Sequence, residues 1–202
     1  MVVFCQVIIA RLLPTRQTYC EIDSGKKIWY DEDAPTGEVN LVEAFRELDI
    51  YVAGSVVDLI VDRGRRNSCE QAWLIGSSSF LNQIDCVASV AGTSDSDQFI
   101  PDMDMVNDII AQWREAGICF CGFIHSHPMG PGFLSGSDIR AMEAWVTAVR
   151  YPFMNFGLVD ADGQLKMYLA YGEECGHIRV NELIPIGDNT NKEYLKWRNR
   201  YD

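Results

Sequence analysis

The seven residues 118–124, ICFCGFI, form a run without a charged side chain and constrain the fold more than any other part of the sequence. A strand can be apolar at nearly every position only if both of its faces are covered, as in the centre of a sheet with helices on each side. Residues 125–138, HSHPMGPGFLSGSD, follow directly. We therefore expect an α/β fold in which this strand leaves the core at a cleft lined by polar side chains.

The remaining segments alternate between strand-like and helix-like patterns. Short apolar runs bounded by turn residues predict strands, and the runs around Asp-Ala-Asp-Gly predict a hairpin. These strands are expected at residues 2–13, 27–30, 70–76, 83–90, 153–159 and 164–171. Apolar residues at helical spacing predict helices. These helices are expected at 41–62 with a break near Gly54, at 102–116 with a stop at Gly117, at 139–149 and around 192–200. This order favours one α/β domain with a curved mixed sheet flanked by helices.

Charge and cysteine content narrow the expected partners and location. The net charge of −12 would repel a phosphate backbone, so nucleic acid is not an expected partner. Seven cysteines, an odd number, lie in segments that resemble core, which favours reduced thiols in the cytoplasm. The opening stretch MVVFCQVIIARLLP lacks a basic leader region and a small-residue cleavage site and is too short to span a bilayer. We expect it to be a buried strand and expect no membrane partner.

Two of the three histidines, His125 and His127, stand one residue apart at the end of the apolar run. Side chains alternate between the faces of a strand, so both imidazoles can bind one cation while Ser126 faces away from them. A catalytic zinc takes three protein ligands and leaves a fourth position open. Asp138, which lies across a Pro-Gly-rich turn in the first turn of the expected helix, is the natural third ligand.

The same residues also have a purely structural explanation. Ser-x-x-Asp before an apolar helical stripe is a capping box, in which Ser135 caps the helix and the helix dipole favours Asp138. The two explanations are compatible, because the hydrogen bonds of a capped helix start would hold a metal ligand in a fixed orientation. A capped helix is expected in either case, and the histidine pair favours a metal site in addition.

The stretch resembles the motif of the JAMM family, the catalytic form of the MPN domain. The family pattern is His-x-His-Pro, six further residues and Ser-x-x-Asp, and residues 125–138 match it at every position. JAMM proteins are zinc metalloproteases, known best as isopeptidases that cut ubiquitin and ubiquitin-like proteins from their conjugates. The resemblance implies one catalytic Zn²⁺ held by His125, His127 and Asp138. It also implies a layered fold broadly similar to that of the cytidine deaminases, whose own signatures are absent here.

The family also needs an upstream glutamate, in a pattern resembling E-x-x-G-L-L-x-G. Glu70 in EQAWLIGS fits that register. The sequence departs from the pattern at two positions, because Trp73 stands where a small residue is usual and Gly76 comes one place before the expected glycine, where Ser77 stands. The resemblance therefore implies that Glu70 completes the site.

The resemblance covers roughly residues 48–172, which we expect to be the catalytic domain. Residues 1–47 would be an N-terminal extension whose strands pack on the core, and residues 173–202 a C-terminal segment. The compact form resembles the prokaryotic, bacterial branch of the family. Members of that branch often accompany ubiquitin-like conjugation machinery, which is therefore a further expected partner.

The resemblance also implies a mechanism. Zinc lowers the pKa of a bound water toward neutrality. Glu70 would take the proton of that water and later hand it to the leaving amine, and the Ser135 hydroxyl would help to stabilise the oxyanion. The expected function is hydrolysis after the C-terminus of a ubiquitin-like protein, in deconjugation or precursor maturation. The ubiquitin-like protein or its conjugate is the expected partner.

Two other functions stay open. A non-catalytic MPN scaffold would bind partners without cleaving them, and displacement of Glu70 by Trp73 would favour it. A JAMM peptidase that trims an amino acid or a short peptide from a small carrier protein would use the same site. The loop 129–133 either borders a substrate groove or is a turn with Phe133 packed beneath it.

Overall fold

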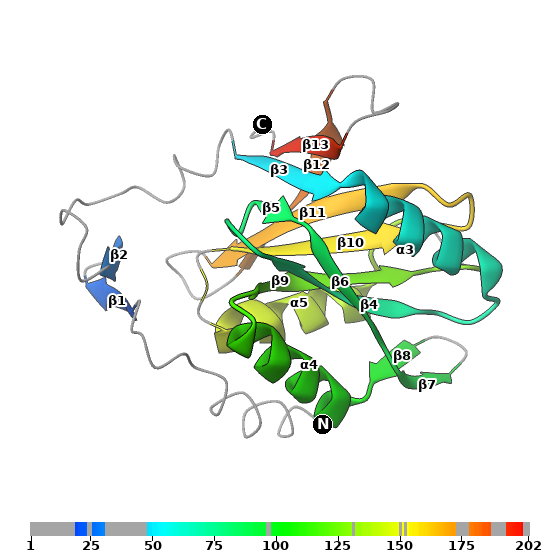
Figure 1. The fold of residues 1–202 in the computed structure, drawn as a ribbon, viewed down its shortest axis with the longest axis horizontal. Coiled ribbons are helices and arrows are strands. Elements are labelled where there is room, and N and C mark those ends of the chain that lie inside the picture. Colours follow the sequence, from blue (N-terminus) through cyan, green and yellow to red (C-terminus); the bar gives the residue numbers. More distant parts are fainter. Residues whose placement is uncertain are drawn as a thin grey trace.

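The computed structural model describes residues 19–23, 26–30, 48–95, 98–130, 132–149, 151, 153–172, 178–186 and 193–199. One mixed sheet (Figure 1) contains β3 (Asp49–Ala53), β4 (Ala72–Ser77), β5 (Gln83–Ile84), β6 (Cys86–Val90), β9 (Cys119–Ser126), β10 (Met154–Val159), β11 (Leu165–Gly172), β12 (Ile178–Pro185) and β13 (Tyr194–Asn199). Separate two-stranded sheets are formed by β1 (Tyr19–Asp23) with β2 (Lys26–Tyr30) and by β7 (Gly92–Asp95) with β8 (Gln98–Pro101). The helices of this part of the chain are α3 (Gly54–Arg66), α4 (Met103–Glu115) and α5 (Gly136–Val149). Across the described residues, no helix has the length and apolar character that crossing a bilayer requires.

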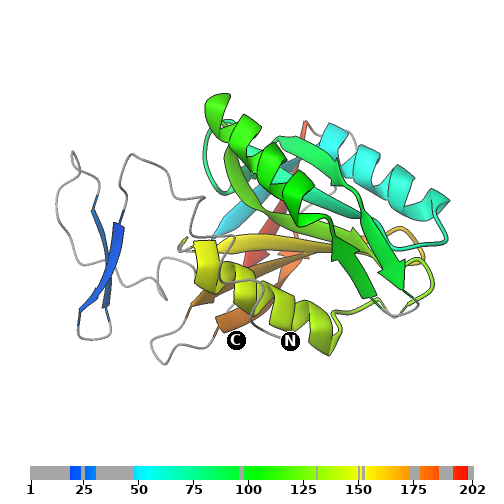
Figure 2. The ribbon, with the colours of Figure 1, turned by 90° about the horizontal axis from the view of Figure 1, so that it is seen from below.

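The main sheet has the strand order β5-β3-β13-β12-β11-β10-β9-β4-β6 and is strongly curved (Figures 1 and 2). Its two edges come from one short piece of chain, because β5 pairs with β3 and β6 pairs with β4. Asp85 lies between β5 and β6, and its backbone N–H donates to the Gly76 carbonyl at 3.1 Å. Its carboxylate accepts hydrogen bonds from the N–H and the hydroxyl of Ser78, at 2.9 and 2.5 Å. The sheet therefore nearly closes on itself.

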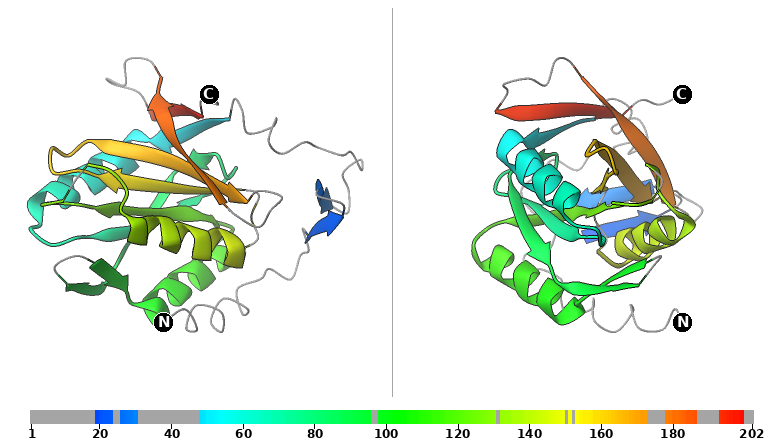
Figure 3. Two further views of the ribbon diagram at one scale, coloured as in Figure 1. Left: turned by 180° about the vertical axis from the view of Figure 1, so that it is seen from behind. Right: turned by 90° about the vertical axis from the view of Figure 1, so that its right-hand side faces the viewer.

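Helices cover both faces of the main sheet. Figure 3 shows α3 on one side of the sheet and α5 on the other. Strand β9 lies between two core clusters, with Cys121 and Ile124 in the cluster that α3 joins and Phe120 in the cluster that α4 and α5 join. The central strand that the apolar run 118–124 predicts is thus buried between two layers of helices.

Most of the expected elements are present. The elements confirmed, with small shifts of their ends, are the strands at 27–30, 70–76 and 118–124, the helices at 102–116 and 139–149, and the antiparallel hairpin of 153–159 with 164–171. The strand expected at 83–90 is also present, divided at Asp85 into β5 and β6. The segments 2–13 and 41–47 lie outside the described residues. The expected α/β class, with a curved mixed sheet flanked by helices, is confirmed.

The helical expectation for 41–62 is confirmed from Gly54 onward and wrong before it, and the helix expected around 192–200 is wrong. Residues 49–53, part of the helix expected at 41–62, form strand β3, and helix α3 begins only at Gly54. Residues 194–199, near the end of the chain, form strand β13. These two strands pair with each other antiparallel, and Arg198 of β13 donates to the Asp49 carboxylate of β3 at 2.7 and 3.1 Å. A partner distant in sequence decides both segments, and spacing within one segment does not reveal that partner.

Strand β9 is irregular where it pairs with β4. The pairing shifts so that Cys121 is an extra residue on β9, and such a bulge changes the face on which the following side chains emerge. Phe120 and Phe123 are three positions apart and still lie together, with ring centroids 5.3 Å apart. His125, two residues after Phe123, follows on the same face because the strand is regular again there.

We predict that Gly122→Ala lowers the free energy of unfolding by at least about 3 kcal/mol. Gly122 has a φ of +146°, and a Cβ there would lie 1.7 Å from the Asn155 carbonyl oxygen of β10. Gly117→Ala is the matched control, because Gly117 has a φ of +75° and a Cβ there would meet nothing within 4 Å. The control should lose about 1 kcal/mol through backbone strain alone. Urea denaturation followed by circular dichroism measures both losses, and equal losses would contradict the close approach of β9 and β10.

Candidate metal centre

Strand β9 carries the histidine pair to the edge of the core. His125 lies in the strand, and His127 follows Ser126, the last residue of β9. The His127 backbone N–H donates to the Val159 carbonyl of β10 at 2.9 Å, which ties this residue to the neighbouring strand. The two imidazole Nε2 atoms lie 3.1 Å apart. The two rings therefore present their nitrogens to one point, as the alternation of side chains predicts.

Ser126, between the histidines, faces away from them as predicted. It is fully buried, and a Cβ on Gly64 of α3 would lie 3.5 Å from its Cβ, so Ser126 packs beneath that helix. The Ser126 hydroxyl accepts a hydrogen bond from the Gln71 N–H at 3.0 Å, and the Ser126 N–H donates to the Gln71 carbonyl at 2.9 Å. This residue therefore holds in place the residue that follows Glu70.

Glu70 lies two residues before β4, at the same end of the sheet. Its Oε1 is 3.8 Å from His127 Nε2, and its side chain is half-buried. Trp73, the unusual residue of this segment, is buried in the core cluster that α3 joins, so it does not displace Glu70. Gly76 also has a structural reason, because a Cβ there would come within 2.8 Å of the Trp113 ring of α4. Both departures from the family pattern are accommodated away from the site.

Ser135 and Asp138 form the predicted capping box at the start of α5. The Asp138 N–H donates to Ser135 Oγ at 3.2 Å, and the Ser135 N–H donates to Asp138 Oδ2 at 2.6 Å. These bonds orient the Asp138 carboxylate toward the histidines, with Oδ1 3.4 Å from His125 Nε2 and Oδ2 3.6 Å from His127 Nε2. The orientation that lets Asp138 cap the helix therefore also points its carboxylate at the two histidines.

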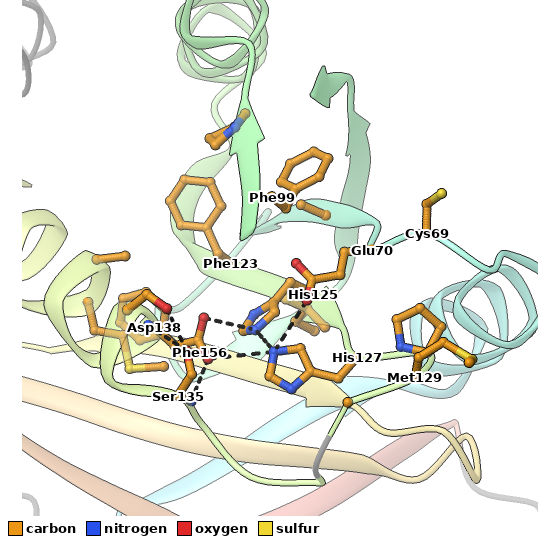
Figure 4. A pocket seen from close by; sticks show the side chains of 18 of the residues that line it. Cys69, Glu70, Phe99, Phe123, His125, His127, Met129, Ser135, Asp138 and Phe156 are labelled. Carbon is orange, nitrogen blue, oxygen red and sulfur yellow. Dashed lines mark hydrogen bonds and ion pairs between the residues drawn. The ribbon is translucent and has the colours of Figure 1, made fainter. Parts of the chain in front are cut away.

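His125, His127 and Asp138 come together as a group that could hold a metal ion (Figure 4). The two imidazole Nε2 atoms lie 3.1 Å apart, His125 Nε2 lies 3.4 Å from Asp138 Oδ1, and His127 Nε2 lies 3.6 Å from Asp138 Oδ2. With one ligand atom from each residue, the three atoms lie within 4.8 Å of one another. Donors about 2.0–2.2 Å from a tetrahedral zinc ion lie roughly 3.3–3.6 Å from one another. Two imidazoles and a carboxylate are also a donor set that zinc accepts in three-ligand sites. The side chains therefore fit such an ion in chemistry, and their ligand atoms lie near the spacing that it requires.

The charge of Asp138 suits a metal ligand. Burial by itself raises the pKa of this carboxyl group, but the hydrogen bond and charge of His125 and the hydrogen bonds from Ser135 outweigh burial. The pKa of Asp138 therefore lies well below its ordinary value. The carboxylate is ionised at neutral pH and needs to lose no proton before it binds a cation.

His125, His127 and Asp138, which we call the donor group, line one cavity of about 600 Å³. Glu70 and Ser135 line the same cavity. The loop after the histidines borders it, and Met129 lines the cavity with 87% of its surface exposed. Phe133 is 65% exposed, so of the two alternatives for this loop the turn with Phe133 packed beneath it is wrong. The Lys166 ammonium donates to the Gly132 carbonyl and fastens the loop to β11.

Sequence reasoning missed the apolar part of this cavity. Phe99 of β8, Phe123 of β9 and Trp145 of α5 line it together with the candidate metal ligands. The helical stripe that contains Trp145 predicts a core residue, and Trp145 is indeed buried. A stripe pattern does not separate a side chain that packs in the core from one that also lines a cavity.

No family model and no curated protein matches the chain. Among solved structures, a protein from Desulfitobacterium hafniense is 15% identical with a TM-score of 0.49, over 70% of this chain and 96% of that one. A JAB1/MPN domain protein from Archaeoglobus fulgidus is 14% identical with a TM-score of 0.39, over 64% and 93%. A protein from Salinibacter ruber is 15% identical with a TM-score of 0.43, over 69% and 92%. The α/β fold is evident from this chain's own strand order and helices.

Replacing Ser126 by alanine is expected to lower the free energy of unfolding by about 1–3 kcal/mol, because the Gln71 N–H loses its acceptor. Urea denaturation measures the loss. Ser89→Ala is the matched control, since the Ser89 hydroxyl is exposed and accepts a hydrogen bond from Arg63. The control should change stability by less than about 0.5 kcal/mol. A loss in Ser126→Ala no larger than that of the control would refute the tie between β9 and the Glu70 segment.

Proposed function

We propose that this chain is a zinc-dependent amide hydrolase of the JAMM type that cleaves after the C-terminus of a ubiquitin-like protein. The observation that carries the proposal is the convergence of the donor atoms of His125, His127 and Asp138, with Glu70 beside them in one cavity. The resemblance of residues 125–138 to the JAMM motif supports the same assignment, because that motif contains all three donors and Ser135.

The donor set favours a catalytic over a structural metal site. Three protein ligands leave one position of a tetrahedral ion open, whereas structural zinc sites are closed by four. Bound there, Zn²⁺ would supply Lewis acidity and lower the pKa of a water molecule toward neutrality. The proposal therefore includes one zinc ion per chain, held by His125, His127 and Asp138.

Glu70 would move the protons in this reaction. Its carboxylate lies 3.8 Å from His127 Nε2 and opens into the cavity that the donor group lines. As a general base it would take a proton from the attacking water, and as a general acid it would return that proton to the leaving amine. The second transfer matters because an unprotonated amine is a poor leaving group. The hydrogen bonds between Ser126 and Gln71 keep this carboxylate at the donor group.

The Ser135 hydroxyl would help to stabilise the oxyanion. Its Oγ already accepts a hydrogen bond from the Asp138 N–H and lies 2.7 Å from the Ser137 Oγ. When Ser137 is the donor of that second bond, both lone pairs of Ser135 are occupied and its own proton is available to the substrate. Removing one such donor typically costs about 10²–10³ in kcat.

The proposed substrate is an extended C-terminal tail of a ubiquitin-like protein, either in a conjugate or in a precursor. The β7–β8 hairpin forms a two-stranded sheet of its own, and Phe99 and Pro101 of β8 line the cavity. A strand edge of this kind can add an extended peptide by main-chain hydrogen bonds. Cys69, Cys86, Cys119 and Cys121 are free thiols, which supports a cytoplasmic location. Ubiquitin-like conjugation machinery is proposed as a further partner on the family resemblance alone.

Glu70→Gln is expected to lower kcat on the zinc-loaded protein by about 10²–10⁴ while leaving zinc content unchanged. The measurement is release of product from a panel of ubiquitin-like proteins that carry a C-terminal extension or an isopeptide-linked lysine. Glu143→Gln, an exposed carboxylate on α5, is the matched control and should keep the wild-type rate. Zinc-loaded wild type that cleaves no member of the panel would contradict the proposed substrate. Equal rates for Glu70→Gln and wild type would contradict the role of Glu70.

A further inference from the structure

The cavity has two chemically different ends. At one end lie Glu70, the donor group and Ser135. Apolar side chains form the rest of the lining, which we call the apolar end, and these are Phe99, Pro101, Phe123, Met142, Trp145 and Phe156. Figure 4 shows the rings of Phe99 and Phe123 on one side of the histidine pair and Ser135 on the other. The apolar end is therefore continuous with the place where the proposed chemistry occurs.

The wall of the apolar end is a packed aromatic cluster. The ring centroids of Phe123 and Trp145 lie 4.4 Å apart, and Phe120 stands behind them at 5.3 and 5.8 Å from the two rings. Trp145 and Phe156 are buried, at 9% and 4% exposure. Side chains held in this way keep their shape, so the apolar end is a preformed surface.

Helix α5 sets the length of this end. Asp138, Ala141, Met142 and Trp145 all line the cavity, and their spacing places them on one face of the helix. Two turns separate Asp138 from Trp145, a rise of about 10 Å along the axis. Ala141, between them, is the small residue whose side chain leaves this face open. The total volume of about 600 Å³ lies within the range of small-molecule pockets, about 300–1,000 Å³.

We propose that the apolar end binds a bulky apolar side chain, aromatic or large aliphatic, of the substrate residue on the amine side of the scissile amide. This inference rests on the proposed function, because the occupant is defined by its distance from the donor group. Among the described residues that line the cavity, Glu70 and Asp138 supply the carboxylates and none is lysine or arginine. A charged substrate side chain at the apolar end would lose its hydration without gaining a partner. Glycine would leave the apolar end unfilled.

The test is binding of capped tripeptides Ac-Gly-X-Gly-NH₂ to the full chain without metal, with X as Phe, Leu, Gly or Asp, measured by calorimetry. Burial of a large apolar side chain predicts that the Phe and Leu peptides bind about 10- to 100-fold more tightly than the Gly peptide. The Asp peptide should bind no more tightly than the Gly peptide. Equal affinities across the series would overturn the proposal, and this comparison needs no variant.

Ala141→Phe tests the location, because a ring at this position would fill the apolar end. It should lower the affinity for the Phe peptide at least tenfold, whereas Thr147→Phe, an exposed residue of α5 outside the cavity lining, should leave it unchanged. Unchanged affinity in a folded Ala141→Phe protein would overturn the proposal. A wild-type dimer that Ala141→Phe converts to a monomer in sedimentation would also overturn it, because the occupant would then be a second copy of the chain.

The readout separates this inference from the proposed function. If the protein binds the Phe peptide selectively but hydrolyses no amide, even when loaded with zinc, the proposed side-chain pocket would be supported and the proposed hydrolase function would be contradicted. Hydrolysis with rates that do not depend on X in an otherwise constant peptide would sustain the hydrolase and refute the pocket.

Discussion

Strand β9 is hydrogen-bonded along both of its edges, to β4 and to β10, and the site depends on the point where it leaves that pairing. The parallel register with β10 runs to Ser126 and Val159. There Ser126 also exchanges two hydrogen bonds with Gln71, which precedes β4. The histidine pair and Glu70 come from the ends of these two joined segments, so fixing one fixes the other. A displacement of β9 would disturb the candidate ligands and the candidate base together.

The start of α5 joins stability to function in a similar way. Two reciprocal hydrogen bonds between Ser135 and Asp138 satisfy backbone groups that a helix start would otherwise leave without partners. The same bonds turn the carboxylate toward the histidines and help to keep its pKa low. The structural and the metal-binding explanations of this motif therefore do not compete, because the capping hydrogen bonds orient and ionise the carboxylate that would bind the metal.

The parts of the site that could be predicted from the sequence are those set by local spacing. Alternation along a strand placed His125 and His127 together, and the capping pattern placed Asp138 in the first turn of a helix. Strands β3 and β13 could not be predicted, because each is decided by pairing with the other across most of the chain. The division of residues 83–90 at Asp85 depends on closure of the sheet, which is also a non-local event.

The apolar end of the cavity lies beyond sequence reasoning for a related reason. Phe99, Phe123 and Trp145 belong to three elements, and each by itself has the pattern of a residue that packs in a core. Their arrangement around a cavity depends on how these elements pack and on the bulge at Cys121, which sets the face on which Phe123 emerges. The hydrophobic pattern thus predicts that these side chains are buried, but it does not predict whether they fill a core or line a cavity.

The central claim is that His125, His127 and Asp138 hold one metal ion, and zinc content tests it most directly. Elemental analysis of the full chain, after loading with zinc and removal of excess metal, should find about one zinc per chain in the wild type and almost none in His127→Ala. Circular dichroism would establish that both proteins are folded. A folded wild type that retains no zinc would contradict the account and leave residues 125–138 as a turn followed by a capped helix.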